Sequence, residues 1–345
     1  MNEFELIEQI FSQLQNDPAF ITASKAAGIE KAIGDDASVM ALPAGARLVS
    51  CIDTLVQGRH FSADWDQVND LAFQIGYKAV AVNVSDIAAM GATPHSILLA
   101  LALPERLATE QWLSAFAQGL FHACKLFGVT LIGGDTTRND TLVLSVSAQG
   151  FLSADTPAVY RSGAQVGDKV YVSGTLGDAA YALQHPDDEI GRTLVHRLHM
   201  PTPRITLGAT LAKLGASAMI DISDGLYQDL GHICQQSAVA MRLNLEHLPT
   251  SQPLSTIDLS QRLIHQLTGG DDYELAFTLP AGIEPPFDNA DTPVTCIGEV
   301  VTLTDDKDEA DGCPQLFYQG QAVTQMQPAP FNTLPKLMGY QHFIG

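Results

Sequence analysis

The residues most able to do chemistry in this 345-residue chain are aspartates that stand beside glycines or next to apolar segments. They occur in Gly34-Asp35-Asp36, Ile52-Asp53-Thr54, Ser85-Asp86, Gly133-Gly134-Asp135, Asp221-Ile222-Ser223-Asp224-Gly225 and Gly269-Gly270-Asp271-Asp272. Carboxylates are oxygen ligands that Mg²⁺ prefers, and glycine lets a backbone turn sharply or approach a phosphate closely. Any one of these segments alone is more typical of a turn, and Asp224 could simply cap the helix that follows it. Together they favour a phosphate site that uses several metal ions.

Other phosphate-binding patterns are missing from the sequence. There is no GxxxxGK[ST] P-loop, no set of protein-kinase motifs and no dinucleotide-binding GxGxxG segment. A phosphate site in this chain would therefore depend on metal ions.

Asp86 has the most apolar neighbours of these acids. A helix that ends at Met90, just before Gly91 and Pro94, is predicted. Apolar and small residues recur at helical spacing along it, together with Lys78; they are Leu71, Ile75, Ala79 and Val82. Asn83 and Asp86 share a face of that helix. A carboxylate in such surroundings is costly to bury unless an arginine, a lysine or a metal ion meets it, and we favour Mg²⁺.

The elements that must position these acids alternate between strand and helix. Predicted strands are 47–52, 96–103, 129–132, 141–151, 169–173, 218–222, 240–245, 273–278 and 294–300. Predicted helices are 4–15, the helix to Met90, 110–127, a helix after Gly174–Asp178, 206–214, and one opened by Ser223–Gly225 that runs through Cys234. This is an α/β pattern, in which sites gather at the carboxyl ends of strands. Asp53, Asp135, Asp221 and Asp224 are predicted to lie at such ends.

A domain boundary is expected near residues 151–168, a segment rich in turn-forming residues. The predicted domains are 1–150 and 151–345. A chain of this length is long enough for two domains of ordinary size.

The net charge of −21, from 39 acidic and 18 basic residues, disfavours nucleic-acid binding through a basic surface. The five cysteines are far apart and form no CxxC pair, so neither a disulfide framework nor a zinc site is expected. The N-terminus has no basic, apolar signal sequence, and the longest apolar run, 97–104, is too short to span a bilayer. We therefore expect a cytoplasmic protein without a membrane segment.

Longer motifs containing these aspartates follow one another in a specific order. They are Gly34-Asp35-Asp36-Ala37, Asp53-Thr54-Leu55-Val56 with His60-Phe61, residues 78–92, Gly133-Gly134-Asp135-Thr136-Thr137-Arg138, Ile222-Ser223-Asp224-Gly225-Leu226 and Gly270-Asp271-Asp272-Tyr273-Glu274-Leu275. The ordered set closely resembles the thiamine-monophosphate kinase family, part of the ATP-binding superfamily of aminoimidazole ribonucleotide synthetase. The resemblance runs from about residue 30 to the tail segment 339–343.

The resemblance implies an α/β (α+β), two-domain aminoimidazole ribonucleotide synthetase-like fold. It implies an N-terminal ATP- and Mg²⁺-binding domain whose sheet pairs across a homodimer, and a C-terminal α/β domain that completes the active site. The implied reaction is ATP + thiamine monophosphate → ADP + thiamine diphosphate. The acceptor phosphate attacks directly, so no nucleophilic side chain is needed.

The roles of individual residues are carried over from the family. The implied Mg²⁺ ligands are Asp35, Ile52, Asp53, Asp86, Asp135, Asp221 and Asp224, of which Asp86, Asp135 and Asp224 are the implied catalytic residues. The implied ATP contacts are Gly134, Asp135, Arg161 and Ser223. The implied contacts to thiamine monophosphate are His60, Asp271 and Tyr340.

Two departures from the family pattern change what individual residues can do. Relatives often have Ser/Thr pairs where this chain has Cys51-Ile52, so a metal contact there would use the backbone carbonyl of Ile52. Relatives often have Glu where this chain has Asp271, which has a shorter reach.

The alternatives are a sibling ATP-using enzyme and a non-catalytic acidic protein that binds nucleotide or metal. Selenophosphate synthetase would need a reactive residue before Gly34, where this chain has no Cys. The hydrogenase-maturation relative uses a C-terminal Cys, whereas this chain ends Phe343-Ile344-Gly345.

Overall fold

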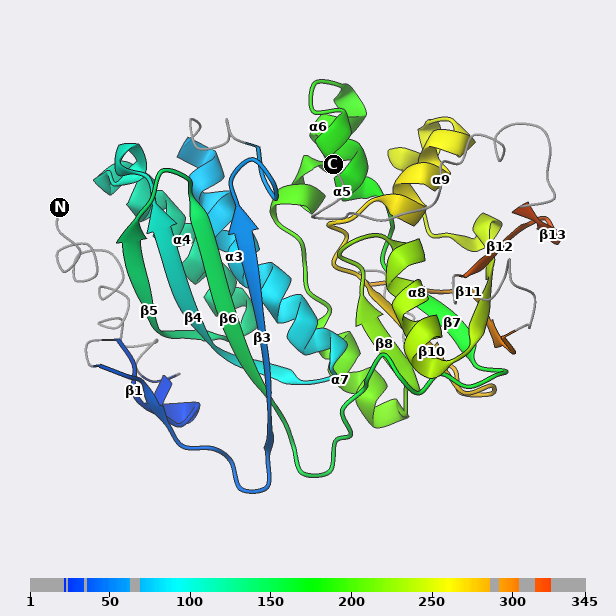
Figure 1. Ribbon diagram of the computed structural model, residues 1–345, viewed down its shortest axis with the longest axis horizontal. Helices are drawn as coiled ribbons and strands as arrows, with labels where there is room; N and C mark the ends of the chain where they lie inside the picture. The colour runs from blue at the N-terminus through cyan, green and yellow to red at the C-terminus, as the bar shows by residue number, and fades with distance from the viewer. Residues whose placement is uncertain are drawn as a thin grey trace. The chain divides into compact units, whose positions relative to one another are not determined.

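The computed structural model describes residues 22, 24–33, 36–62, 69–285, 292–303 and 314–323. The chain divides into two compact units, one formed by residues 1–87 and 92–156 and the other by 88–91 and 157–345. Both units combine helices with β-sheet (Figure 1), so the expected α/β (α+β) character is confirmed. The predicted helix 4–15 lies outside the described residues.

The first unit contains a four-stranded sheet in the order β3-β6-β4-β5. Strand β3 (Arg47–Val56) is antiparallel to β6 (Val143–Leu152), which is antiparallel to β4 (Thr93–Leu103). Strand β5 (Thr130–Arg138) closes the order and is parallel to β4. A separate antiparallel pair is made by β1 (Ile29–Lys31) and β2 (Val39–Met40).

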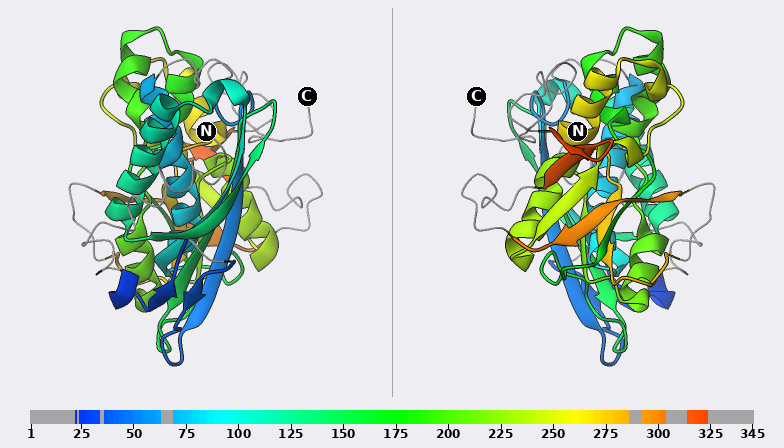
Figure 2. Two further views of the ribbon diagram at one scale, coloured as in Figure 1. Left: turned by 90° about the vertical axis from the view of Figure 1, so that its left-hand side faces the viewer. Right: turned by 90° about the vertical axis from the view of Figure 1, so that its right-hand side faces the viewer.

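Two helices, α3 (Asn69–Ala89) and α4 (Glu110–Phe127), lie on one side of this sheet (Figure 2). The two helices pack so closely at Gly119 of α4 that a Cβ there would lie 1.8 Å from the carbonyl oxygen of Phe73 in α3. Helix α3 also contacts the sheet directly, since a Cβ on Gly150 would lie 2.5 Å from the Ile87 side chain. Glycine at these positions therefore brings α3, which carries Asp86, close to both neighbours.

The second unit contains a seven-stranded sheet in the order β13-β12-β9-β11-β7-β10-β8. Its strands are β7 (Lys169–Ser173), β8 (Ala218–Asp221), β9 (Ala240–Asn244), β10 (Leu275–Leu279), β11 (Val294–Val301), β12 (Gln315–Tyr318) and β13 (Gln321–Ala322). Its helices are α5 (Asp178–Gln184), α6 (Glu189–His199), α7 (Ile205–Leu214), α8 (Leu226–Ser237) and α9 (Leu259–Thr268). Single turns of 3₁₀-helix occupy Glu105–Leu107 in the first unit, and Leu245–His247 and Leu254–Thr256 in the second.

Both faces of this second sheet bury apolar side chains. Val170 and Val172 of β7 pack in one cluster with residues of α8 and α9, such as Ile233 and Leu263. Tyr171, on the opposite face of the same strand, packs in another cluster with residues of α7. The alternation follows from the period of two along a strand, and it explains why β7 reads as a continuous apolar segment.

The prediction that Asp53 and Asp135 lie at strand ends was wrong. The β3–β6 ladder continues past Asp53 to Val56↔Val143, so Asp53 lies within a strand. The Gly133-Gly134 segment, which resembles a turn, continues β5, and Asp135 pairs with Ala100 of β4. Asp221, by contrast, is the last residue of β8, as predicted. Among the described residues, no helix combines the length and the apolar character needed to cross a bilayer.

Candidate active site

Asn83 connects α3 to the segment of β3 that carries Asp53. Its side chain is buried; Oδ1 accepts the Asp53 backbone N–H at 3.0 Å, and Nδ2 donates to the Ala79 carbonyl at 3.0 Å. Both bonds are made by the same side-chain amide. Asn83 therefore fixes the position of the Asp53 backbone relative to α3.

Cys51 lies near both Asp53 and Asp86. Its thiol donates to the Asn83 backbone carbonyl at 3.3 Å and also bonds the Asp86 carboxylate. Burial raises the pKa of the Cys51 thiol well above its usual value, and the charges of Asp86 and Asp53 raise it further. Cys51 is therefore protonated at neutral pH and unsuited to act as a nucleophile. The Ile52 side chain is exposed, as are its alternate neighbours on β3.

Gly134 and Asp135 lie where β5 runs beside β4. A Cβ on Gly134 would lie 2.0 Å from the Leu99 carbonyl oxygen, so only glycine fits this strand position. Asp135, the next residue, is exposed. The bare backbone at Gly134 next to an exposed carboxylate is a surface that a phosphate and its metal ion could approach.

The second unit presents Asp221, Ser223 and Asp224 between β8 and α8. Asp221 is buried and pairs with Leu275 of β10. Ser223 and Asp224 are half-buried in the short loop that follows. Gln228 Nε2 donates to Asp224 Oδ2 at 3.2 Å, one turn further along the chain.

Asp229, to which sequence analysis assigns no role, holds this loop in place. Its Oδ2 accepts the backbone N–H groups of Ser223, Asp224 and Gly225 at 3.1, 3.2 and 3.1 Å. Burial raises the pKa of Asp229 well above its ordinary value, and the nearby charges of Asp221 and Asp224 act in the same direction. Three carboxyl groups thus gather at the start of α8.

Arg161 and Asp224 both lie near His232 of α8. Burial lowers the pKa of His232; the Arg161 charge lowers it further, whereas the Asp224 charge opposes the shift. The Arg161 backbone is fixed by Ser237 Oγ, which donates to its carbonyl at 3.1 Å. His232 was not predicted as a site residue, because a single helical histidine carries no distinguishing motif.

Asp271 has a left-handed backbone, with φ of 68°, and Tyr273 has one with φ of 49°. This conformation is uncommon for residues other than glycine and concentrates at functional sites. The Asp271 N–H donates to the Ser223 carbonyl at 3.0 Å, and the Tyr273 hydroxyl donates to Asp271 Oδ1 at 3.1 Å. Asp271 is therefore brought beside Ser223, although 48 positions separate them in the numbering (271 minus 223).

His60 lies in the turn after β3, where its Nδ1 accepts the Val56 backbone N–H at 3.0 Å. This bond places the exchangeable proton of the neutral ring on Nε2. The predicted residues Asp35 and Tyr340 lie outside the described residues.

Comparison with known proteins identifies the family. Residues 34–152 match the family described as AIR synthase related protein, N-terminal domain. The thiamine-monophosphate kinase of Haemophilus influenzae is 40% identical over 313 residues, which cover 87% of this chain and 89% of that protein. This chain belongs to the thiamine-monophosphate kinase family.

Solved structures of thiamine-monophosphate kinases share the fold. The crystal structure of the enzyme from Stenotrophomonas maltophilia K279a superposes with a TM-score of 0.76 at 38% identity, covering 93% of this chain and 98% of that one. The structure of AaThiL complexed with AMPPCP and TMP gives a TM-score of 0.70 at 29% identity, covering 94% and 96%. The predicted aminoimidazole ribonucleotide synthetase-like fold is thereby confirmed.

The donor chemistry fits the magnesium ions expected for a thiamine-monophosphate kinase. Within the described ranges, no three His, Cys, Asp or Glu side chains are close enough together to hold a metal ion by themselves. Asp53 and Asp86 both lie near Cys51, and Asp221 and Asp224 both lie near Asp229. Mg²⁺ is usually bound by one or two carboxylates with water and substrate phosphates completing its shell, so these carboxylates suit it.

An open groove of about 460 Å³ in the second unit is not part of this site. It is lined by charged residues such as Lys169, Arg242 and Glu299, and none of the predicted site residues that the structure describes borders it. Its cations already have partners, since Lys169 pairs with Glu299 at 3.0 Å and Arg242 lies over the Phe317 ring.

Proposed function

We propose that this chain transfers the γ-phosphoryl group of ATP to thiamine monophosphate, giving thiamine diphosphate and ADP. The observation that carries the proposal is 40% identity to a thiamine-monophosphate kinase over nearly the whole of both chains. The complex of AaThiL with AMPPCP and TMP supports the choice of both substrates.

The residues suit a direct transfer from one substrate to the other. Phosphoryl transfer requires in-line placement and neutralisation of charge rather than a covalent intermediate on the protein. A direct transfer needs no nucleophilic side chain, and the Cys51 thiol beside Asp53 and Asp86 is assigned no such role. The acceptor is itself a phosphate anion, so the main barrier to overcome is repulsion between two anions.

Magnesium would supply that neutralisation when bound. We assign its coordination to the carboxylates of Asp35, Asp53, Asp86, Asp135, Asp221 and Asp224, with the Ile52 carbonyl as an additional oxygen. Asn83 and Asp229, through the hydrogen bonds described above, fix the backbone next to Asp53 and Asp224. The backbone at these two acids is thus fixed before the substrates arrive, which would limit the reorganisation needed during the reaction.

The remaining assignments concern the substrates. Gly134, Arg161 and Ser223 are proposed to contact ATP, because a bare backbone, a guanidinium and a hydroxyl all suit phosphate oxygens. His60, Asp271 and Tyr340 are proposed to contact thiamine monophosphate. An aromatic side chain such as Tyr340 would stack on a thiamine ring, which is cationic in part.

A homodimer is also part of the proposal. On the side of the first sheet away from α3 and α4, alternate residues of β3 and one residue of β4 expose apolar side chains, namely Leu48, Ile52 and Leu98. Exposed apolar sheet faces commonly mark protein interfaces. Sedimentation should give a dimer for the wild type and a monomer for Leu48→Asp; a monomeric wild type would contradict the dimer. A cytoplasmic location is proposed because the described cysteines are free thiols.

A product assay tests the function. Purified protein incubated with ATP, Mg²⁺ and thiamine monophosphate should form thiamine diphosphate and ADP in equal amounts. ATP binding without either product would instead support a nucleotide-binding protein. ADP formation that requires a different acceptor would indicate a sibling enzyme of the superfamily.

A further inference from the structure

Glu274, at the end of the Gly-Gly-Asp-Asp-Tyr-Glu segment, lies at the centre of a buried ionic network in the second unit. Its side chain is fully buried, yet it accepts hydrogen bonds from three residues. Arg204 Nε donates to Oε2 at 2.6 Å, Arg197 Nη2 donates to Oε1 at 2.7 Å, and Ser173 Oγ donates to Oε2 at 2.6 Å. Arg204 adds a second bond to Oε1, so the pair is bidentate.

The hydrogen-bond donors to Glu274 come from three different parts of the chain. Ser173 ends β7, Arg197 lies in the last turn of α6, and Arg204 immediately precedes α7. The carboxylate is enclosed tightly, since a Cβ on Gly174 would lie 2.1 Å from Glu274 Oε1. Although burial raises the pKa of Glu274, the hydrogen bonds and charge of Arg204, with the charge of Arg197, hold it below its ordinary value. The carboxylate is therefore anionic and fixed in one orientation.

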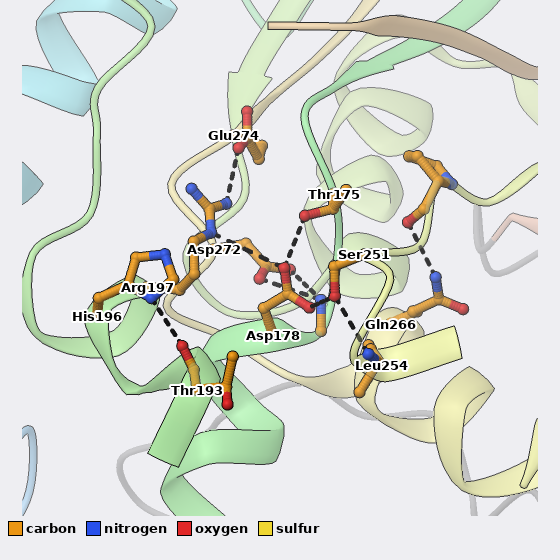
Figure 3. A network of polar contacts seen from close by, with 12 residues as sticks. Thr175, Asp178, Thr193, His196, Arg197, Ser251, Leu254, Gln266, Asp272 and Glu274 are labelled. Atoms are coloured by element: carbon orange, nitrogen blue, oxygen red, sulfur yellow. Dashed lines mark hydrogen bonds and ion pairs between the residues drawn. The ribbon is translucent and has the colours of Figure 1, made fainter. Parts of the chain in front are cut away.

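A second buried carboxylate, Asp272, extends the network along the same segment (Figure 3). Asp272 accepts the Gly177 backbone N–H at 2.9 Å through Oδ2. Arg197 Nε lies 4.0 Å from Asp178 Oδ2, and Asp178 in turn accepts from Thr175 and Ser251. Asp272 and Glu274, two residues apart, thus fasten the segment to the turn after β7.

The residues between and before these anchors have the uncommon backbone. Asp271 and Tyr273 both adopt positive φ, and neither is glycine. Their N–H groups donate to the carbonyls of Ser223 and Ile222 at 3.0 and 2.8 Å, and the Ile222 N–H donates to the Glu274 carbonyl at 2.8 Å. Such a conformation persists only where surrounding contacts impose it. Here the buried side chains of Asp272 and Glu274 provide contacts that hold the segment.

We propose that Glu274, held by Arg204 and Arg197, is a positioning residue that fixes the Asp271 carboxylate for the acceptor substrate. The role of Asp271 rests on the proposed function above. Buried ion pairs contribute little net stability compared with well-packed apolar residues, and in some proteins they are retained because they specify one geometry. Arg204 matters through its planar, bidentate guanidinium, which lysine cannot reproduce.

The kinetic test is a double-mutant cycle between Arg204→Lys and Asp271→Ala. Arg204→Lys should raise the KM for thiamine monophosphate about 10-fold or more, as small misplacements of binding groups do, and change the KM for ATP much less. In the Asp271→Ala background the same change should have an effect of under about 2-fold, because its target is gone. Glu274→Gln, which keeps the shape but loses the charge, should behave like Arg204→Lys. Arg192→Lys, on α6 but bonded to the Asp187 carbonyl instead, is the matched control.

An equal multiplicative loss in both backgrounds, or equal losses for ATP and acceptor, would overturn the positioning role. A second readout is independent of activity. Hydrogen exchange at the Asp271 and Tyr273 amides should be faster in Arg204→Lys than in Arg192→Lys, and unchanged exchange would overturn the inference. If wild-type protein forms no thiamine diphosphate, the proposed function fails, and the exchange comparison still decides whether Glu274 fixes this segment.

Discussion

Replacing Asp229 by alanine removes one oxygen atom that accepts three consecutive backbone N–H groups. These groups belong to Ser223, Asp224 and Gly225, which form the turn between β8 and α8. Two of the three residues carry proposed ATP or metal contacts. The substitution therefore tests whether a buried carboxyl group that belongs to none of the sequence motifs shapes the site.

The expected loss of stability is the balance of two opposing effects. A buried donor left without an acceptor costs about 1–3 kcal/mol. Gly225 is buried, but Ser223 and Asp224 are half-buried, so water can reach their N–H groups after truncation. Removing Asp229 also relieves its costly burial beside Asp221 and Asp224, which raises its pKa in the native protein. We expect Asp229→Ala to lower the free energy of unfolding by about 2 kcal/mol. Asp229→Asn keeps one accepting oxygen without a charge and should lose less than about 1 kcal/mol.

Urea denaturation followed by circular dichroism measures both changes. The ordering of wild type, Asp229→Asn and Asp229→Ala is the decisive feature. The reasoning is refuted if Asp229→Ala is as stable as the wild type, or if Asp229→Asn loses as much stability as Asp229→Ala.

Three further predictions follow from individual contacts. Asp86→Asn should reduce turnover by about two orders of magnitude or more without changing the circular dichroism spectrum, whereas the exposed Asp140→Asn should not; near-wild-type turnover of folded Asp86→Asn would exclude a metal role. Gly134→Ala should destabilise the protein by about 1–3 kcal/mol in urea titrations, because its Cβ would lie 2.0 Å from a backbone oxygen, while a Cβ on Gly133 meets only a leucine side chain at 3.2 Å and should cost less. Burial, with the charge of His185, lowers the pKa of His265 from 6.5 to about 4. As the pH is lowered, His265 is protonated in the unfolded chain before it is protonated in the folded protein, so stability falls as the pH drops from 6.5 to about 4. The stability advantage of wild type over His265→Gln should shrink by about 2 kcal/mol from pH 7 to pH 4.5, and a constant difference would contradict the shift.

The fold was predictable where the local pattern was strong. Helix 110–127 and strand 169–173 occur with the predicted bounds. Helices α6 and α9 were not predicted, because each is short and its charged and polar residues mask a narrow apolar face. Leu194 and Leu198 of α6 are buried, and α6 packs against α5, a tertiary contact that the periodicity of α6 alone does not reveal.

The sequence motifs supply the acids of the candidate site but not the residues that hold them in place. Asp53, Asp86, Asp221 and Asp224 all belong to motifs; the first two lie near Cys51 and the last two near Asp229. The sequence pattern places Asn83 only on the same helix face as Asp86 and does not reveal its bond to the Asp53 backbone. The supporting role of Glu274 depends on partners 70 and 77 positions away in the sequence, and no spacing rule connects them.

The central claim is that this chain moves a phosphoryl group directly from ATP to thiamine monophosphate. A single-turnover experiment with excess protein, Mg²⁺ and ATP labelled at the γ-phosphorus tests it most directly. The account predicts that the label appears in thiamine diphosphate in step with ADP formation, with none retained on the protein after acid quenching. Label recovered on the protein, or released as free phosphate while thiamine monophosphate remains unchanged, would contradict the account.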